Sequence, residues 1–342
     1  MRTHIVAEMA WGHDGKPDQA IALLRAAKEA GADSFSFHVT DVPNYMVKYY
    51  GNGEGRVSAG REALDVYTYL EKIDLKREDW VRFAGVAREI GIKLCAMPND
   101  LPSLRFCEEA IKPELYVVSP ASFVEQDMLE GIARAGKPTL FRIGGAYLAE
   151  IENAVGTFRR LGNEKIILLH GFQNYPTKLE ESDLSLIPSL KAMFNVEIGI
   201  ADHLDGDDPF AKILPVLALP YGATYVEKHI TLDRSAKSED FESALDPAGF
   251  AEMVRNVRYA EVAAGTPYFK ALSPATLRYR GVVRKRLVAA RALNEGEVLT
   301  ADALIAKRCD VGVTPDQLPH MVGRRLRVPL EKDEALAVDK LL

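Results

Sequence analysis

The sequence is poor in cysteine, and the little it has follows no recognisable pattern. Its 342 residues include three cysteines, Cys95, Cys107 and Cys309. An odd number at wide, irregular spacing argues against both a disulfide framework and a structural zinc site. Sparse cysteine is typical of proteins that stay in a reducing compartment, so we expect a cytoplasmic protein.

Long apolar runs and excess positive charge are also missing. No apolar run approaches the roughly 18 residues that a membrane span needs, and the first residues, MRTHIVAEMAWGHDG, lack the pattern of a signal peptide. Lys and Arg number 43 against 49 Asp and Glu, a net charge of −6, which disfavours nucleic acid as a partner. The remaining composition, 47% hydrophobic and 27% charged, is that of a globular protein with neither a nucleic-acid nor a membrane partner.

Short β-rich runs alternate with amphipathic helical patterns such as 17–30 and 148–161. Helix ends with a Gly cap lead into strands at EAGAD, EIGIK and ARAGKP. Eight such strands predict a (β/α)8 barrel of about 250 residues, and an open doubly wound sheet is the alternative. The expected strands are 3–9, 33–38, 92–98, 114–119, 138–143, 165–170, 196–202 and 223–229.

Two segments interrupt this alternation. Residues 40–75 form a long insertion after the second strand, which we interpret as a lid or binding loop. Its GNGEG at 51–55 lacks the strand–turn–helix context of a nucleotide fingerprint. The second break, a Pro-, Gly- and Tyr-containing stretch, reads as a linker. We therefore predict a barrel domain at 1–263, a linker at 264–281 and a small β-rich domain at 282–342.

Histidines gather where the predicted strands end. Of the seven in the chain, four close a strand and His13 lies in the loop after the first strand. In a barrel these strand ends form the face that carries active sites. A single such histidine is more often structural, but the group together indicates a site. The four strand-closing histidines are His38, His170, His203 and His229.

His203 and His229 end the seventh and eighth strands. Adjacent strands lie about 4.8 Å apart, so the two imidazoles can hold one divalent ion and leave coordination positions open for water and substrate. A hydrogen-bonded His pair on the barrel rim is equally compatible with the spacing. Asp202 and Glu227 are nearby carboxylates that we expect strand alternation to turn away from the histidines.

Other polar groups at the same face are candidates for catalysis or binding. Glu8 ends an apolar first strand, where a carboxylate without a partner would have a raised pKa suited to acid–base work; a structural salt bridge is the alternative. The turn HGFQNYPT, which contains Gln173 and Tyr175, is a candidate sugar-contacting loop or an ordinary turn.

At this point a family resemblance becomes visible. The segments VAEMAWGHDG, GADSFSFH, MPND, GKPTLFRIGGAYLAEIENAV, LLHGFQNYPT, IGIADH and VEKHITLDR follow one another as they do in sialic acid synthases. The tail, with NEGEVLTADALIAKR and VGRRL, resembles the antifreeze-like (SAF) domain that ends those enzymes. The resemblance covers nearly the whole chain in order.

The resemblance implies a fold, a reaction and an assembly. The fold is a (β/α)8 TIM barrel followed by the SAF domain, in a swapped homodimer. The reaction joins phosphoenolpyruvate to an N-acylated hexosamine, with a divalent ion, usually Mn²⁺, activating the sugar aldehyde. The resemblance makes His203 and His229 the metal ligands and Glu8 and Asp240 the catalytic carboxylates. We expect substrate contacts from Gln173, Tyr175, Arg142, Asp202 and, from the partner chain, Arg308.

The sequence departs from this family at the phosphoenolpyruvate end of the site. Ser36 and Val117 stand where the family has phosphate-binding lysines, and Ala201 replaces a serine. Losing two lysines removes large electrostatic contributions to phosphate binding. Arg142 is a candidate replacement for one charge, and Lys48 or Arg56 of the 40–75 insertion is a candidate for another. Three hypotheses follow: a synthase with a rebuilt phosphate site, a metal-dependent aldolase, lyase or isomerase that does not use phosphoenolpyruvate, and a non-catalytic carbohydrate-binding protein.

Overall fold

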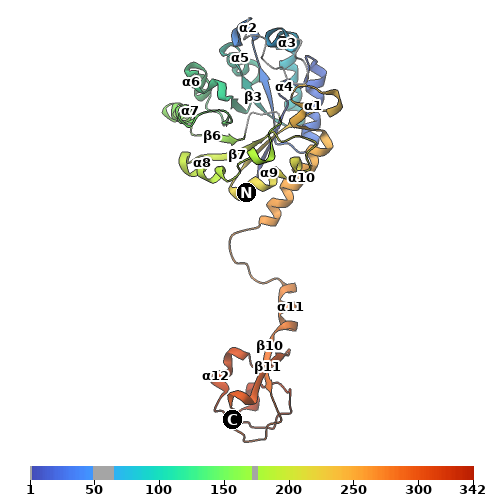
Figure 1. Cartoon of the computed structure of the whole chain (residues 1–342), viewed down its shortest axis with the longest axis vertical. Coiled ribbons are helices and arrows are strands. Elements are labelled where there is room, and N and C mark those ends of the chain that lie inside the picture. Colours follow the sequence, from blue (N-terminus) through green and yellow to red (C-terminus); the bar gives the residue numbers. More distant parts are fainter. Residues whose placement is uncertain (1, 49–64, 172–175) are drawn as a thin grey trace. The chain divides into compact units, whose positions relative to one another are not determined.

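Eight parallel strands close into a barrel surrounded by helices (Figure 1). The computed structural model describes residues 2–48, 65–171 and 176–342. The strands follow chain order, and β1 pairs with both β2 and β8. This closure confirms the predicted (β/α)8 barrel and rules out the open doubly wound sheet, which would leave β1 and β8 unpaired with each other.

The eight predicted strands match the eight barrel strands within about two residues at each end, which is the usual precision of such boundaries. The strands are β1 His4–Glu8, β2 Ser34–Val39, β3 Lys93–Pro98, β4 Leu115–Val118, β5 Thr139–Arg142, β6 Ile166–His170, β7 Glu197–Asp202, β8 Tyr225–Ile230, β9 Ala244–Leu245, β10 Lys285–Ala289 and β11 Leu304–Arg308. The α-helices are α1 Pro17–Glu29, α2 Val42–Tyr45, α3 Val66–Ile73, α4 Arg77–Ile90, α5 Leu101–Phe106, α6 Gln126–Arg134, α7 Leu148–Arg160, α8 Leu186–Phe194, α9 Leu214–Ala218, α10 Pro247–Ala264, α11 Pro274–Val283 and α12 Leu318–Met321.

Local sequence signals explain where several helices end. Gly91 caps α4 in the left-handed conformation at φ 67°, and Gly136 follows α6 at φ 66°. Glycine adopts this conformation without steric cost, so the chain can turn at once into the next strand. The Gly caps predicted from EIGIK and ARAGKP are thereby confirmed.

Two apolar layers hold the barrel together. The larger lies between the strands and the surrounding helices, and includes Phe35, Phe37 and Trp80. The smaller fills the barrel interior. Because side chains alternate along a strand, each strand supplies both layers, and its last inward residue is left at the mouth of the barrel. The interior layer consists of Val6, Cys95, Met97, Leu115, Val117, Leu140, Ile167, Leu169 and Ala201.

The chain divides into two compact units, residues 1–265 and 266–342. The second unit has its own buried core, which includes Leu287, Leu326 and Leu336, and strands β10 and β11 pair antiparallel within it. Across the described residues, no helix is both long enough and apolar enough to cross a membrane.

Candidate active site

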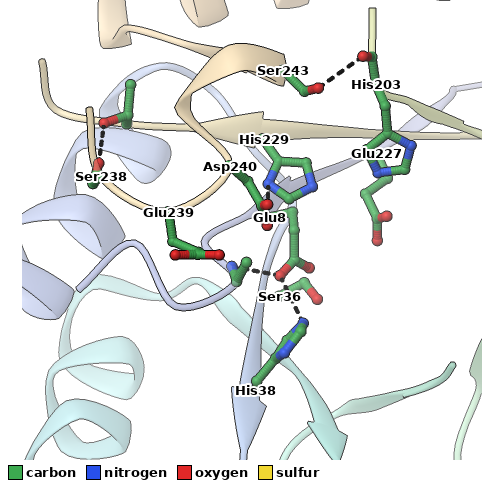
Figure 2. A network of polar contacts seen from close by, with 12 residues as sticks. Glu8, Ser36, His38, His203, Glu227, His229, Ser238, Glu239, Asp240 and Ser243 are labelled. Atoms are coloured by element: carbon green, nitrogen blue, oxygen red, sulfur yellow. Dashed lines mark hydrogen bonds and ion pairs between the residues drawn. The ribbon is translucent and has the colours of Figure 1, made fainter. Parts of the chain in front are cut away.

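Glu8 occupies the centre of the polar mouth at the carboxyl ends of the strands. It lies opposite Ser36 of β2 and His229 of β8 in the strand register, so three neighbouring strands deliver polar groups at one level. Glu8 is completely buried, and its Oε1 accepts the backbone N–H of Ala10 at 2.6 Å. Figure 2 shows it between His38 on one side and the His229–Asp240 pair on the other.

Arg142 reaches across the barrel from the end of β5 to two carboxylates. Its Nη2 donates to Glu8 Oε2, while Nε and Nη2 bind the two oxygens of Glu227 at 2.9 and 3.0 Å. The guanidinium also lies 3.4 Å from Ser36 Oγ and 3.7 Å from Met97 Sδ. All three ionisable side chains are at least 95% buried. Each of these buried charges is stabilised by an opposite charge, because a single unpaired buried ion would have a large desolvation cost.

The shared guanidinium separates the pKa values of the two carboxyls. Burial raises the pKa of Glu8, but Arg142, His229 and hydrogen bonds from Ser36 and Ala10 outweigh burial and leave it below its usual value. Burial raises the pKa of Glu227, the charge of Glu8 adds to this, and Arg142 offsets only part of it. Divergent pKa values in one carboxyl pair are typical of sites that divide acid and base roles.

His203 and His229 lie beside each other on neighbouring strands. Their ring centroids are 5.2 Å apart, and the residues are 2% and 3% exposed. Burial and the nearby His203 ring hold the pKa of His229 well below its usual value. His229 is therefore neutral, which is the form of imidazole that binds metal ions.

The loop after β8 brings Asp240 to this pair. Asp240 adopts a left-handed conformation at φ 58°, and its Oδ2 lies 4.0 Å from His229 Nδ1. Two serine hydroxyls fix the loop: Ser243 donates to the His203 carbonyl at 2.8 Å, and Ser238 bonds Thr231 at 3.1 Å (Figure 2). Burial, with Glu239, Glu8 and Glu242 nearby, raises the pKa of Asp240 to about 8.

This donor set suits an open metal site rather than a closed one. No group of three or more His, Cys, Asp or Glu side chains able to hold a metal lies within the part of the chain that the structure describes. Two imidazoles at adjacent strand ends can supply two ligands, with substrate and water completing the shell. His203 and His229 therefore fit a divalent ion that works on a bound substrate.

Comparison with known proteins places this barrel in a family. The model of the NeuB family matches residues 23–268. The chain belongs to the NeuB family. The SAF domain model matches residues 284–342, so the resemblance to sialic acid synthases and their SAF domain is confirmed for both units.

Several relatives of this NeuB-family chain are named as sugar-acid synthases. It is 28% identical to the N,N'-diacetyllegionaminic acid synthase of Legionella pneumophila, over 98% of this chain and 94% of that protein. It is also 28% identical to human N-acetylneuraminate-9-phosphate synthase, over 97% and 90% of the two chains. The crystal structure of a Leptospira borgpetersenii N-acetylneuraminic acid synthetase in complex with citrate matches with a TM-score of 0.68 and 25% identity, over 82% and 92%.

Two predicted residues of this NeuB-family barrel, Asp202 and His170, bind groups outside the Arg142 cluster. Asp202 is turned away from the Arg142 cluster and binds Lys228 at 3.1 Å with both side chains fully buried. His170 bonds the Ser182 carbonyl at 3.0 Å. In the second unit, Arg308 donates to the Val282 carbonyl. Gln173 and Tyr175 fall outside the described residues, as does GNGEG at 51–55.

The expected orientation of Glu227 was wrong. We expected it to point away from the histidines, but it faces the interior and binds Arg142. The signal was available in the sequence: Glu227 and His229 are two positions apart in one strand, and such residues share a face. His38 was predicted only as one member of the histidine group, because its proximity to Glu8 depends on the pairing of β1 with β2.

Proposed function

We propose that this NeuB-family chain is a sugar-acid synthase that joins phosphoenolpyruvate to the aldehyde carbon of an N-acylhexosamine-type aldose. The products are a nonulosonic-type sugar acid and phosphate. The observation that carries the proposal is the convergence of Glu8, Arg142, His203 and His229 at one barrel mouth. Relatives matched along nearly the whole chain are named for syntheses of this kind.

The proposal includes a divalent ion, with Mn²⁺ the ion that the family resemblance implies. His203 and His229 would hold it. A bound ion supplies Lewis-acid polarisation of the aldehyde oxygen. The chain's own groups do the remaining work: Arg142 offers a cation to the donor's anionic groups, and Glu8 holds a full negative charge at the centre of the mouth.

A second candidate is a metal-dependent aldolase or lyase that uses an unphosphorylated keto acid such as pyruvate. The charge of the mouth favours it. Among the described residues, the buried cations are Arg142 and Lys228, and each is already bound to buried carboxylates. Ser36 and Val117 add no charge. A phosphorylated donor brings more negative charge into this mouth than a keto acid does. The electrostatic cost of that extra charge is larger in a site from which water is excluded, because the effective dielectric constant is lower there.

Phosphate release distinguishes these functions. We expect release from phosphoenolpyruvate with Mn²⁺ and one member of a panel of free and phosphorylated hexosamines, abolished by His229→Ala and retained by His320→Ala, a change at an exposed residue of the second unit. Consumption of pyruvate without phosphate release would favour the aldolase. No turnover of either donor by folded, metal-loaded protein would favour the non-catalytic carbohydrate-binding alternative.

Arg142 gives a second test of the donor. The change Arg142→Lys keeps the charge but loses the bidentate geometry. If Arg142 binds phosphoenolpyruvate, this variant should have a KM for phosphoenolpyruvate raised about tenfold or more, which corresponds to the loss of roughly one charge-assisted hydrogen bond. Arg134→Lys, on the exposed surface of α6, is the control. An unchanged KM in Arg142→Lys would contradict the assignment of Arg142 to the donor.

A further inference from the structure

His38 is buried beside Glu8 yet has no hydrogen bond among the residues that the structure describes. It lies at the end of β2 and is 8% exposed. Among the described residues, neither Nδ1 nor Nε2 has a partner within hydrogen-bond distance, and Nε2 is 3.6 Å from Glu8 Oε1. Buried polar groups in native proteins are nearly always paired, so both nitrogens require an explanation.

The neighbouring residues hold the His38 ring in position but do not form hydrogen bonds with its nitrogens. The Trp11 ring meets His38 edge to face, with centroids 4.3 Å apart. The charged or titratable groups around His38 are Glu8 from β1, Arg142 from β5 and His13 from the loop after β1. Burial, with help from Arg142 and His13, holds the pKa of His38 well below its usual value, so the ring is neutral before substrate binds.

Glu8 determines which ring nitrogen carries the proton. A neutral imidazole has one N–H and one lone pair, and the ionised Glu8 offers only lone pairs to Nε2. The N–H therefore belongs on Nε2, and the lone pair belongs on Nδ1. The 3.6 Å separation is long for a hydrogen bond, but contacts in catalytic dyads are often long before substrate binds.

We infer that Glu8 and His38 form a carboxylate–imidazole dyad, and that His38 is a further catalytic residue whose Nδ1 accepts a proton in the reaction. Glu8 would orient the ring and stabilise the imidazolium that forms, as the aspartate of a Ser–His–Asp triad does for its histidine. This inference rests on the proposed function for its reaction, whereas the dyad itself rests on the burial of His38 and its position beside Glu8.

Both candidate donors need such a base. With phosphoenolpyruvate, C3 of the donor bonds to the aldehyde carbon, whose oxygen takes a proton from solvent. Water then adds to C2 and gives one proton to Nδ1. Phosphate leaves C2 with the bonding electrons and takes the remaining hydroxyl proton, so that C2 becomes a ketone. With pyruvate, a C3–H bond breaks, the proton passes to Nδ1, and the electron pair forms the enolate that attacks the aldehyde.

His13 provides a matched control. It is also buried, at 1% exposed, and its Nε2 has no partner among the described residues. Its Nδ1, however, accepts the backbone N–H of Gly15 at 3.1 Å. The lone pair of His13 is therefore occupied by its own turn, whereas among the described residues no group donates to the lone pair of His38.

The first test needs no turnover. NMR of protein with ¹⁵N-labelled histidine distinguishes the two neutral tautomers, and resonances are assigned with His38→Gln and His13→Gln. We expect His38 to carry its proton on Nε2, and Glu8→Gln to change the shifts of His38 while leaving those of His320 in place. A proton on Nδ1 of His38 in the wild-type protein would overturn the dyad.

The second test is kinetic. His38→Gln keeps hydrogen-bonding atoms but cannot accept a proton near neutral pH, so we expect kcat to fall about 100-fold or more, with KM changed by less than about threefold. Added imidazole should restore kcat of His38→Ala about tenfold and leave His13→Ala unrescued. A His38→Gln enzyme with wild-type kcat would overturn the catalytic role.

The two tests separate the possible failures. If the wild-type chain turns over neither donor, the proposed function fails, while the tautomer of His38 still decides whether the dyad exists. If His38→Ala does not fold, as its melting curve would reveal, the more conservative His38→Gln still decides the kinetic question.

Discussion

At the scale of single residues, the mouth of the barrel depends on Arg142. This one cation is bound by Glu8 and Glu227 in a setting where all three side chains are buried. Removing one member of such a set leaves uncompensated buried charge, whereas an exposed pair contributes little. The stability of the barrel and the chemistry of its mouth are therefore linked through the same side chain.

Arg142→Met should destabilise the barrel strongly. We expect a loss of about 3–5 kcal/mol in the free energy of unfolding, because two carboxylates lose their shared cation. The matched change Arg134→Met, which removes an i,i+4 partner of Glu130 from a 62% exposed position, should cost about 0.5 kcal/mol or less. Urea unfolding followed by the fluorescence of Trp11 and Trp80, both in the barrel unit, measures the difference. Equal losses of unfolding free energy in the two variants would contradict a stabilising role for the buried Arg142 ion pairs.

His4 should make the barrel sensitive to acid. Burial lowers the pKa of His4 to about 4, whereas the unfolded chain protonates it near 6.5. The unfolded chain therefore binds a proton at His4 before the folded chain does, and acid favours unfolding. The free energy of unfolding is unaffected by His4 above about pH 6.5 and falls as the pH is lowered towards 4, by about 1–2 kcal/mol at pH 5. His4→Gln should flatten the dependence of stability on pH between 7 and 5, and the exposed His320→Gln should not. An unchanged slope in His4→Gln would show that other groups govern the acid response.

At the scale of elements, the first turn of α5 ties two loops of the mouth together. Asp100 accepts hydrogen bonds from the backbone N–H and the hydroxyl of Ser103. It also accepts the backbone N–H of Asp41, in the loop after β2, at 2.7 Å. A single buried carboxylate thereby caps a helix and holds the neighbouring loop.

Asp100→Ala should cost more than the loss of an ordinary helix cap. An exposed N-cap contributes about 1 kcal/mol, which is our expectation for Asp65→Ala at the start of α3, where Asp65 accepts the N–H of Thr68. Asp100→Ala should cost about 2 kcal/mol or more, because it also leaves a buried donor unpaired. Melting temperatures of the two variants give the comparison, and equal shifts would contradict a bridging role for Asp100.

The sequence predicted the elements well because their signals are local. Apolar runs and Gly caps identify strands and helix ends within a few neighbouring residues. The orientation of Glu227 was equally local and was misjudged. The pairing of Arg142 with Glu8 was not local: it joins strands 134 residues apart in the chain, and only the closed barrel brings their ends together.

At the scale of the whole molecule, the two units have separate cores. We expect residues 1–265 and 282–342 to fold as separate proteins, since each contains its own buried apolar cluster. Circular dichroism and melting curves of the two fragments measure this, with the full chain as reference. A fragment 282–342 without a cooperative transition would show that the small domain needs the linker or the barrel.

The oligomeric state of the molecule is predicted only by the family resemblance. We propose the swapped homodimer of the family, with Arg308 acting in the partner's site. Light scattering of the full chain should give twice the mass of one chain. Arg308→Ala should lower kcat/KM for the sugar about tenfold, as expected for a lost charge-assisted contact, while leaving the mass unchanged. Full activity of a monomer would contradict this assembly.

The most direct measurement is incorporation of a labelled three-carbon unit into a sugar acid. We incubate three proteins, the wild-type chain, His229→Ala and His203→Ala, with Mn²⁺, a hexosamine panel and ¹³C₃-labelled phosphoenolpyruvate or pyruvate. The masses of the products are then measured by mass spectrometry. We expect the wild-type chain to form a sugar acid that carries all three labelled carbons, and both histidine variants to form none. A folded wild-type protein that forms no labelled product from either donor would contradict carbon–carbon bond formation at this mouth.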